Sequence, residues 1–190
     1  MPAFFLEAQV SERLFHGGIK AGLNLAQIDG DEVLGYDKWA YHAGLAGGFN
    51  LGGIHEIQLE FLYSLRGSRY TRLDTVPAKF SLHYLEVPLI YCLKDWLSDD
   101  EKNPYYKVHF QGGFSTGFLF NSSSYNGQDA NFNRFDLSWL LGVQFFPRRD
   151  LGAYFRYTSS LTPLDRFTKN GREIRMISYF LSLGLNYRFN

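Results

Sequence analysis

Hydrophobic and polar residues alternate along most of the chain with a period of two. Between residues 39 and 51 the odd-numbered positions are mostly apolar, from Trp39 to Leu51. The even-numbered positions of the same stretch are small or polar, as at His42 and Asn50. Successive side chains of a β-strand point to opposite faces, so this alternation is typical of strands with one apolar face. The pattern predicts β-structure through most of the sequence.

The same alternation recurs in eight segments, each longer than the roughly 5–6 residues usual in soluble proteins. A tilted membrane strand needs about 9–11 residues. No apolar stretch approaches the roughly 20 residues of a membrane helix. The predicted strands are 17–28, 39–51, 54–67, 79–94, 106–119, 134–147, 151–162 and 175–189.

The connections between these segments alternate in length. Short turns are expected at Gly52-Gly53 and at Pro147–Asp150, and longer polar loops at 29–38, 68–78, 121–131 and 162–173. Residues 95–106 are an exception, being long for the short-turn side. Outer-membrane barrels are built with short turns at one end and long loops at the other. An even number of strands then places both termini on the short-turn side, which is the periplasm.

Alternation alone does not say which face points inward. A lipocalin-like barrel would turn its apolar face inward around a ligand, and a membrane barrel turns it toward lipid. Three features favour lipid. The polar face is rich in Gly, Ser and Asn, which suit a crowded interior; the apolar face carries aromatic residues near strand ends, such as Trp39, Tyr91 and Tyr187; and an aromatic residue, Phe189, stands next to the last position.

The apolar stretch Leu82–Leu93 carries a glutamate and a proline, both poor choices for an ordinary buried strand. On a barrel strand Leu85 and Leu89 face lipid while Glu86 and Pro88 face the lumen. Pro88 cannot donate a hydrogen bond to the neighbouring strand, so a bulge or local break is expected there.

A family resemblance rests on the ordered segments GIKAGLN, YHAGLAGGF, LEFLYSLRG, YLEVPLIY, FQGGFSTGFLF, FDLSWLLGVQF, YFRYTSSL and LGLNYRF. In this order they resemble the PorT-like outer-membrane β-barrel family of Bacteroidota, from Gly17 almost to the end. The most specific piece is Tyr84–Leu89. The resemblance implies an eight-stranded outer-membrane barrel. The namesake member is linked to protein secretion by the type IX system, but no set of functional residues carries over.

Composition excludes several partners and cofactors. The 19 Lys and Arg residues balance the 19 Asp and Glu residues. The chain therefore lacks the net positive charge that would indicate a nucleic-acid partner. A single cysteine, Cys92, rules out an internal disulfide and a cysteine zinc cluster. No cofactor or metal is expected. Residues 1–16 read as a periplasmic tail or the remnant of a signal segment with cleavage after Ala8, and 17–190 as the barrel.

The strongest candidate chemistry is a charge network inside the barrel. If the 68–79 turn aligns strands 54–67 and 79–94, Glu60 lies close to opposite Glu86, and one of the two is expected to hold a proton. Arg156 points inward at mid-strand and is the expected counter-charge. The other expected inward cations, nearer the strand ends, are Lys20, Arg66, Arg134 and Arg188. Such a network either fills a narrow lumen with salt bridges or forms a general-acid or proton site.

Two further chemistries are weaker. One is an outer-membrane lipid hydrolase, which is suggested by the five histidines His16, His42, His55, His83 and His109. No spacing in the sequence, however, identifies a nucleophile, a base and an orienting group. Acidic residues at Asp29–Glu32 could bind calcium but lack the spacing of an EF-hand loop, which favours a solvated acidic loop.

Small residues on the lipid face suggest a contact with another protein. Ala21, Ala43 and Gly47 lie on the outer face of the first two strands. Small residues allow close approach of a neighbour within a membrane, as argued for helices. The hypothesis is a docking face for a larger outer-membrane protein.

Together these features predict an all-β protein: a closed eight-stranded antiparallel transmembrane barrel in the outer membrane of a Gram-negative bacterium. Its surroundings are outer-membrane lipid and lipopolysaccharide. The expected role is a non-enzymatic accessory or scaffold subunit of an envelope complex, secretion-related by resemblance. The alternatives are a stand-alone barrel that binds through its extracellular loops and a lipid-modifying enzyme.

Overall fold

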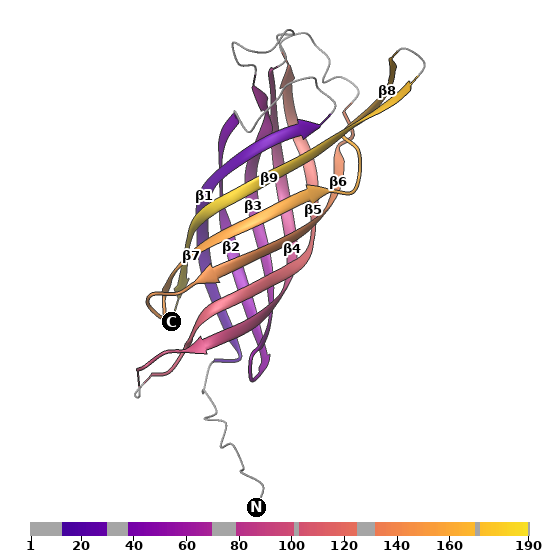
Figure 1. The fold of residues 1–190 in the computed structure, drawn as a ribbon. Coiled ribbons are helices and arrows are strands. Elements are labelled where there is room, and N and C mark those ends of the chain that lie inside the picture. The colour runs from indigo at the N-terminus through magenta and orange to yellow at the C-terminus, as the bar shows by residue number, and fades with distance from the viewer. Residues whose placement is uncertain are drawn as a thin grey trace, which may run out of the picture.

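Eight long strands close into a tilted antiparallel barrel in the computed structural model of the chain (Figure 1). The structure describes residues 13–29, 38–69, 79–100, 103–124, 132–169 and 172–189. Neighbouring strands in the sequence pair with each other, and the last strand pairs with the first. The strands are β1 (Phe15–Asp29), β2 (Lys38–Gly52), β3 (His55–Arg69), β4 (Lys79–Leu97), β5 (Tyr106–Ser124), β6 (Phe135–Phe145), β7 (Leu151–Ser160) and β9 (Arg172–Phe189).

A short strand, β8 (Asp165–Lys169), completes the set. It pairs with the first residues of β9, and the two form a hairpin that projects beyond the barrel wall (Figure 1). The predicted fold class and barrel strand number are therefore confirmed. The structure differs from the prediction at 162–173, where a loop was expected. Part of this segment instead continues the sheet as β8 and the start of β9.

The two ends of the barrel differ in the connections between strands that they carry. β1 starts and β9 finishes at the end that carries the turns around Gly53 and at Pro147–Asp150 (Figure 1). We call this the turn end and the opposite one the loop end. Among the described residues, no helix is long and apolar enough to cross a membrane.

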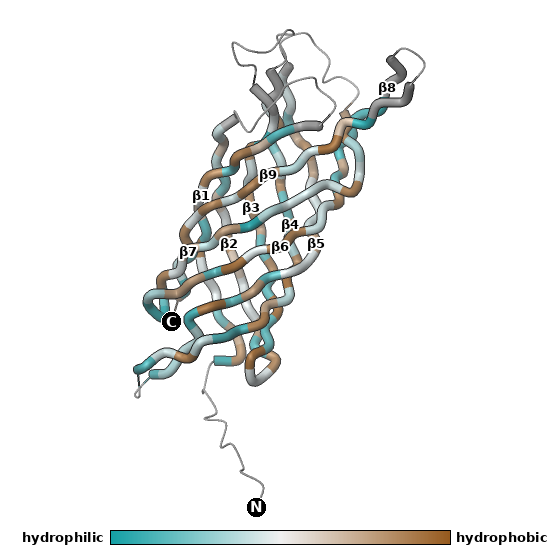
Figure 2. Tube along the Cα trace, viewed as in Figure 1, coloured by the Kyte–Doolittle hydropathy of each residue, from teal (hydrophilic) through white to brown (hydrophobic). Residues whose placement is uncertain are grey.

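The predicted division between the two faces is confirmed by burial. Leu85 and Leu89 are 52% and 57% exposed on the outer surface, whereas Glu86 between them is 4% exposed and faces the lumen. Brown and teal segments accordingly alternate along each strand in Figure 2. The apolar side of the sheet therefore faces outward over the barrel wall, as lipid contact requires.

Pro88 produces a local break but no bulge. The β3–β4 pairing runs through Leu59↔Leu89 and resumes at Leu62↔Glu86 in the same register, skipping the two pairs between. A missing proline N–H removes one ladder hydrogen bond without adding a residue. The β4–β5 register shift lies instead between His83 and Tyr84.

One glycine is required by the close approach of two strands. A Cβ built on Gly44 would lie 1.9 Å from the carbonyl oxygen of Phe61 on β3. Because that obstacle is backbone, any larger residue at this position would have to separate β2 from β3.

Candidate functional site

The candidate site is the barrel lumen, which is lined by charged and polar side chains that water barely reaches. Lys20, Glu60 and Arg156 are 2%, 0% and 4% exposed. Buried charges are stable only when they are paired and hydrogen-bonded. The lumen meets this requirement through three groups of ion pairs, described in turn from the middle.

The Glu60 group places one carboxylate between two cations. Arg156 on β7 donates from Nη1 and Nη2 to the two oxygens of Glu60 on β3, at 2.9 Å each. Lys20 on β1 makes an ion pair with Oε1 of the same carboxylate. Two parallel N–H···O bonds from one guanidinium are the strongest form of such a pair. The group ties three strands across the barrel and carries a net charge of +1.

The Arg66 group reverses this arrangement by placing one guanidinium between two carboxylates. Arg66 on β3 donates from Nε to Glu86 Oε1 at 2.9 Å and from Nη1 to Asp136 Oδ2 at 2.6 Å. Its guanidinium carbon lies 4.6 Å and 4.3 Å from the ring centroids of Tyr84 and Phe180. This group ties β3, β4 and β6 together and carries a net charge of −1.

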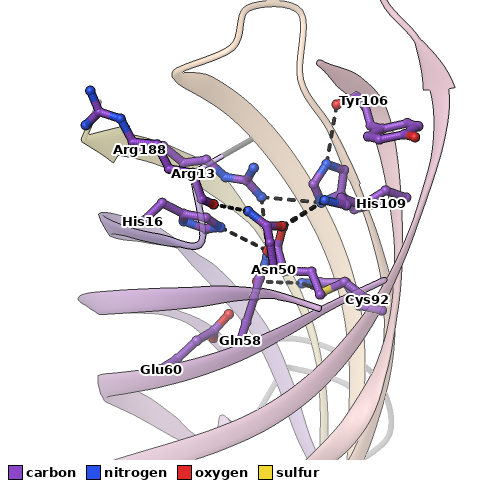
Figure 3. A network of polar contacts seen from close by, with 12 residues as sticks. Arg13, His16, Asn50, Gln58, Glu60, Cys92, Tyr106, His109 and Arg188 are labelled. Atoms are coloured by element: carbon purple, nitrogen blue, oxygen red, sulfur yellow. Dashed lines mark hydrogen bonds and ion pairs between the residues drawn. The ribbon is translucent and has the colours of Figure 1, made fainter. Parts of the chain in front are cut away.

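The Glu56 group lies toward the turn end. Glu56 forms ion pairs with His16 at 3.1 Å, Arg188 at 3.5 Å and Lys94 at 3.9 Å. Figure 3 shows His16, Arg188, His109 and Asn50 gathered in this part of the lumen. Residues from both ends of the chain and from its middle therefore meet around one carboxylate.

Two glutamines connect the Glu56 group to the Glu60 group. Gln58 donates to Glu56 at 2.5 Å, and Gln111 donates to Gln58 at 3.1 Å. Arg156 in turn donates to Gln111 at 3.3 Å. The polar contacts thus run without interruption from the turn end to mid-barrel.

The expected opposition of Glu60 and Glu86 is wrong. In the β3–β4 ladder Leu62 faces Glu86, and the register carries Glu60 to the level of Pro88. The strands align two residues away from the expected register. Each carboxylate has its own cation, so the geometry removes the reason for the two acids to share a proton.

Of the other residues that were predicted to face the lumen, four do so and one does not. Lys20, Arg66 and Arg156 lie inside the lumen, and Arg188 reaches it with 12% of its side chain exposed. Arg134 is exposed, because it precedes the start of β6. Its expected inward position is therefore wrong.

Three charged lumen residues were missed. Glu56, Lys94 and Asp136 are 0%, 2% and 5% exposed. Each continues the inward-facing alternation of its strand, which was the available signal. Glu56, for example, stands two and four residues before Gln58 and Glu60.

The lumen has little free space at its middle. The cavity between Asn24, His42 and Arg156 measures about 10 Å³. One water needs about 10–15 Å³ measured in this way. The middle of the barrel is therefore filled by side chains, as expected for eight strands.

The loop end of the lumen is closed by apolar side chains. These come from β4, β5 and β9 and from the segments that precede β6 and β8. The cluster consists of Leu82, Tyr84, Leu119, Phe132, Leu164 and Met176, all at most 8% exposed. Apolar contacts thus cover the Arg66 group on the side away from mid-barrel.

The histidines have partners other than serine among the described residues. His42 contacts the hydroxyl of Tyr154 inside the lumen, and His109 Nδ1 accepts a hydrogen bond from Arg188 Nη2 at 3.3 Å. On the outer surface His55 and His83 contact Tyr91 and Tyr63 hydroxyls at 2.6 and 2.8 Å. His16 pairs with Glu56 as described above. No Ser–His hydrogen bond joins these residues in the described part of the chain.

The small residues of the outer face lie side by side. Ala21 faces Ala43 across the β1–β2 ladder, and Gly47 faces Gly17. Bulky pairs stand between and beyond them on the same face: Ile19–Leu45, Leu23–Tyr41 and Phe15–Phe49. Small and bulky pairs therefore alternate every two residues, or about 6.8 Å along the strands.

Some expectations fall outside the described residues. Residues 30–32 of the acidic segment Asp29–Glu32 are among these, as are residues 1–12 of the N-terminal segment. Within the described ranges, no group of three or more His, Cys, Asp or Glu side chains could hold a metal ion.

Comparison with known proteins agrees with this architecture. The model of the family described as "Outer membrane protein beta-barrel domain" matches residues 7–166. The structure of the attachment invasion locus protein Ail of Yersinia pestis, in complex with the heparin analogue sucrose octasulfate, has a TM-score of 0.52. It shares 18% identity over 93% of this chain and 100% of that one.

Two other solved structures are similar at lower scores. Neisserial surface protein A has a TM-score of 0.45 and 13% identity, over 93% of this chain and 98% of that one. OprG of Pseudomonas aeruginosa has a TM-score of 0.42 and 11% identity, over 93% and 94%. A search of curated protein sequences found no match. The matched residues and the closed barrel together show that the chain is an outer-membrane β-barrel protein and belongs to the outer membrane protein beta-barrel domain family.

Proposed function

We propose that this barrel is a non-enzymatic, non-conducting accessory subunit that docks on a larger outer-membrane protein complex. The observation that carries the proposal is the filled lumen. In the orientation that we propose, both termini and the turn end lie in the periplasm. Outer-membrane lipid and lipopolysaccharide surround the apolar wall.

The lumen supports this proposal because its charges are used to join strands. The Glu60 and Arg66 groups each connect three strands, and the space between them is about the size of one water. Apolar residues then cover the loop end. A barrel closed in this way can interact with other molecules through its outer wall and its two ends.

The β1–β2 wall supports a docking face for the larger protein. The small pairs Ala21–Ala43 and Gly17–Gly47 stand between bulky pairs on this face. Bulky side chains of a partner would pack against the small pairs, since association within lipid depends on close packing.

The resemblance to the PorT-like family of Bacteroidota gives the proposal its finer form. In the block Tyr84–Leu89, which carries the most specific part of the resemblance, Glu86 faces the lumen and is bound to Arg66. We place the chain in that subfamily and assign the larger complex to protein secretion of the type IX kind.

The first experiment measures the mass of the complex extracted from native outer membrane in mild detergent and identifies its components. The proposal predicts a large, defined assembly. Ala43→Trp should abolish co-purification, and Leu141→Trp, an outward residue of β6, should not. Recovery of a 21.9 kDa chain alone from the membrane would contradict the docking role.

Conductance tests the filled lumen separately. The protein should form no ion-selective pore in planar bilayers. A steady open conductance would contradict the non-conducting part of the proposal while leaving docking to the co-purification result.

A second function is favoured by the β8–β9 hairpin, which extends the sheet beyond the wall at the loop end (Figure 1). Such a hairpin could bind an extracellular partner without a complex in the membrane. Replacing residues 166–174 by a short turn should abolish surface binding by a stand-alone barrel and leave the assembly proposed above unchanged.

A further inference from the structure

The connection between β4 and β5 is long for the turn end, and the docking role does not use it. The β3–β4 ladder ends at His55↔Leu93, whereas the β4–β5 ladder continues to Leu97↔Tyr106. The two strands therefore leave the barrel as a hairpin, which projects beyond the wall at the turn end (Figure 1). We call residues 94–107 the β4–β5 hairpin.

Internal contacts hold the β4–β5 hairpin together, and one contact draws it toward β6. The backbone N–H of Ser98 donates to the carbonyl of Tyr105 at 2.8 Å, and Lys107 Nζ donates to Asp99 at 2.9 Å. The hydroxyl of Tyr105 donates to the carbonyl of Pro147 in the β6–β7 turn at 3.0 Å. The hairpin therefore has a fixed position beside the outer edge of β6.

Trp96 breaks the alternation of β4 within this hairpin. Cys92 and Lys94 face the lumen and are 0% and 2% exposed, and an extended strand would turn Trp96 the same way. The φ angle of Trp96 is instead 56°, in the left-handed region that bulky residues rarely adopt. Its ring centroid lies 6.3 Å from that of Phe145, whose side chain faces outward at the end of β6. The left-handed conformation thus brings the indole to the outer face.

Protein contacts use only part of the indole. Lys107 Nζ lies 5.3 Å from the ring centroid, and Phe145 packs beside the ring, yet 59% of Trp96 stays exposed. Its backbone N–H donates to Asp95, but no group in the described part of the chain accepts a hydrogen bond from the indole N–H. A backbone conformation that is unfavourable for tryptophan therefore presents an apolar ring and a free donor to the surroundings of the barrel.

Trp96 lies at the level where the apolar wall ends. Along β4, the outward residue Leu93 is followed on the same face by Asp95, which is charged and exposed. On β6, the outward residue Phe145 is followed shortly by the exposed Arg148. Charged side chains are unfavourable in hydrocarbon, so the lipid chains give way to headgroups and water at this level. Tryptophan favours this boundary because its ring is apolar and its N–H is polar.

We propose that Trp96 anchors the β4–β5 hairpin in the headgroup layer of the membrane, where its indole N–H donates to an ester or phosphate oxygen of a phospholipid. Lipid is the occupant because Trp96 extends, through Phe145, the wall that already faces lipid. The anchor holds the hairpin beside the membrane and leaves the exposed Asp99 and Asp100 in water. The inference holds for either leaflet and does not depend on the docking role.

Depth-dependent fluorescence quenching tests where the indole lies. The chain has three tryptophans, so the double variant Trp39→Phe/Trp139→Phe leaves Trp96 as the only one. It is folded into phosphatidylcholine vesicles whose lipid chains carry bromine either near the headgroup or near the chain end. Bromine near the headgroup should quench Trp96 about twofold more strongly than bromine near the chain end. Acrylamide in the water should quench it less than it quenches free tryptophan.

Trp139 supplies the matched control. It stands on β6 between the outward residues Leu137 and Leu141 and pairs with the outward residue Phe114, within the apolar wall. In Trp39→Phe/Trp96→Phe it is the only tryptophan, and its ratio of deep to shallow quenching should exceed that of Trp96. Should a double variant fail to fold, fluorine NMR of the wild-type chain labelled with fluorotryptophan gives the same comparison, using paramagnetic lipids and a paramagnetic solute in the water.

Hydrogen exchange in the same vesicles measures the anchoring effect. Trp96→Ala should release the hairpin and speed the exchange of the Ser98 amide about tenfold, because that amide is bonded only within the hairpin. Trp39→Ala, the same change at an exposed tryptophan on β2, should leave the exchange of Ser98 unchanged.

Three results would overturn the anchor. One is a Trp96 signal that bromine does not quench and that acrylamide quenches as fully as free tryptophan, which would place the indole in water. Another is a depth profile equal to that of Trp139, which would place the indole among the lipid chains. The third is unchanged exchange of Ser98 in Trp96→Ala. None of them alters the mass of the assembly extracted from native membrane, so this inference and the docking role fail separately.

Discussion

The Glu60 group and the Arg66 group do the same structural work with opposite charges. In the first, one carboxylate holds two cations from β1 and β7. In the second, one guanidinium holds two carboxylates from β4 and β6. Their net charges of +1 and −1 offset each other along the lumen.

The comparison shows which residue of each group is hardest to replace. Removing an outer member leaves the central charge with one partner. Removing the central member leaves two like charges facing each other in a place that water barely reaches, and breaking a buried pair costs far more than an exposed one. The two groups also differ in chemistry, because carboxylates can be neutralised by protonation whereas a guanidinium stays charged.

The largest effect is expected for Glu60→Gln. It leaves Lys20 and Arg156 without an anion and should lower the free energy of unfolding by about 3–5 kcal/mol.

Urea unfolding of the barrel in phospholipid vesicles at pH 7, followed by tryptophan fluorescence, measures this effect. A Glu60→Gln barrel as stable as wild type would show that the Glu60 group contributes packing and not charge. The control is Asp99→Asn, which changes a residue outside the lumen. Gln58→Glu would not serve as a control, because it adds a charge.

The next largest effect is expected for Arg66→Gln. It leaves Glu86 and Asp136 without a cation and should cost about 3 kcal/mol at neutral pH. The same unfolding assay at pH 7 checks this loss. A loss no larger than that of Lys20→Met would break the comparison, because the central member would then be no harder to replace than an outer one.

A smaller loss of stability is expected when either outer member of the Glu60 group is replaced, and the two losses should differ. Arg156→Met removes both 2.9 Å hydrogen bonds to Glu60 and should cost about 2–3 kcal/mol. Lys20→Met leaves that pair of bonds intact and should cost about 1 kcal/mol. Equal losses in the two variants would mean that the bidentate geometry adds nothing to the ion pair.

The fold could be predicted almost completely from the sequence, because lipid on one side and a polar lumen on the other impose a strict period of two. That constraint identified the eight barrel strands and the faces of Leu85, Glu86 and Leu89. It could not identify β8. Residues 165–169 extend the sheet away from the barrel, where no alternation between lipid and lumen is imposed.

The site could be predicted only in part, because the face of a residue depends on its own strand whereas its partner depends on register. Alternation placed Glu60, Arg156 and Arg66 inside. It did not fix how β3 aligns with β4, and an error of two residues put Glu60 opposite Glu86 in place of Pro88. The partners on β6 and β9 lie up to 132 residues away in the sequence, as Arg188 does from Glu56.

The smallest effect is expected for an ion pair outside the lumen. Asp99, in the turn between β4 and β5, accepts a hydrogen bond from Lys107 Nζ at 2.9 Å, and 94% of its side chain is exposed. This hydrogen bond and the charge of Lys107 lower the pKa of Asp99 below its ordinary value. The pair therefore favours the folded state above the ordinary pKa of an aspartate, and that contribution is lost as the pH falls through the lowered one. Water and salt screen such a pair, so Asp99→Asn should leave the urea midpoint at neutral pH unchanged within error. A loss comparable to that of Lys20→Met would mean that burial is not what gives the lumen pairs their strength, and the contrast between lumen and surface would fail.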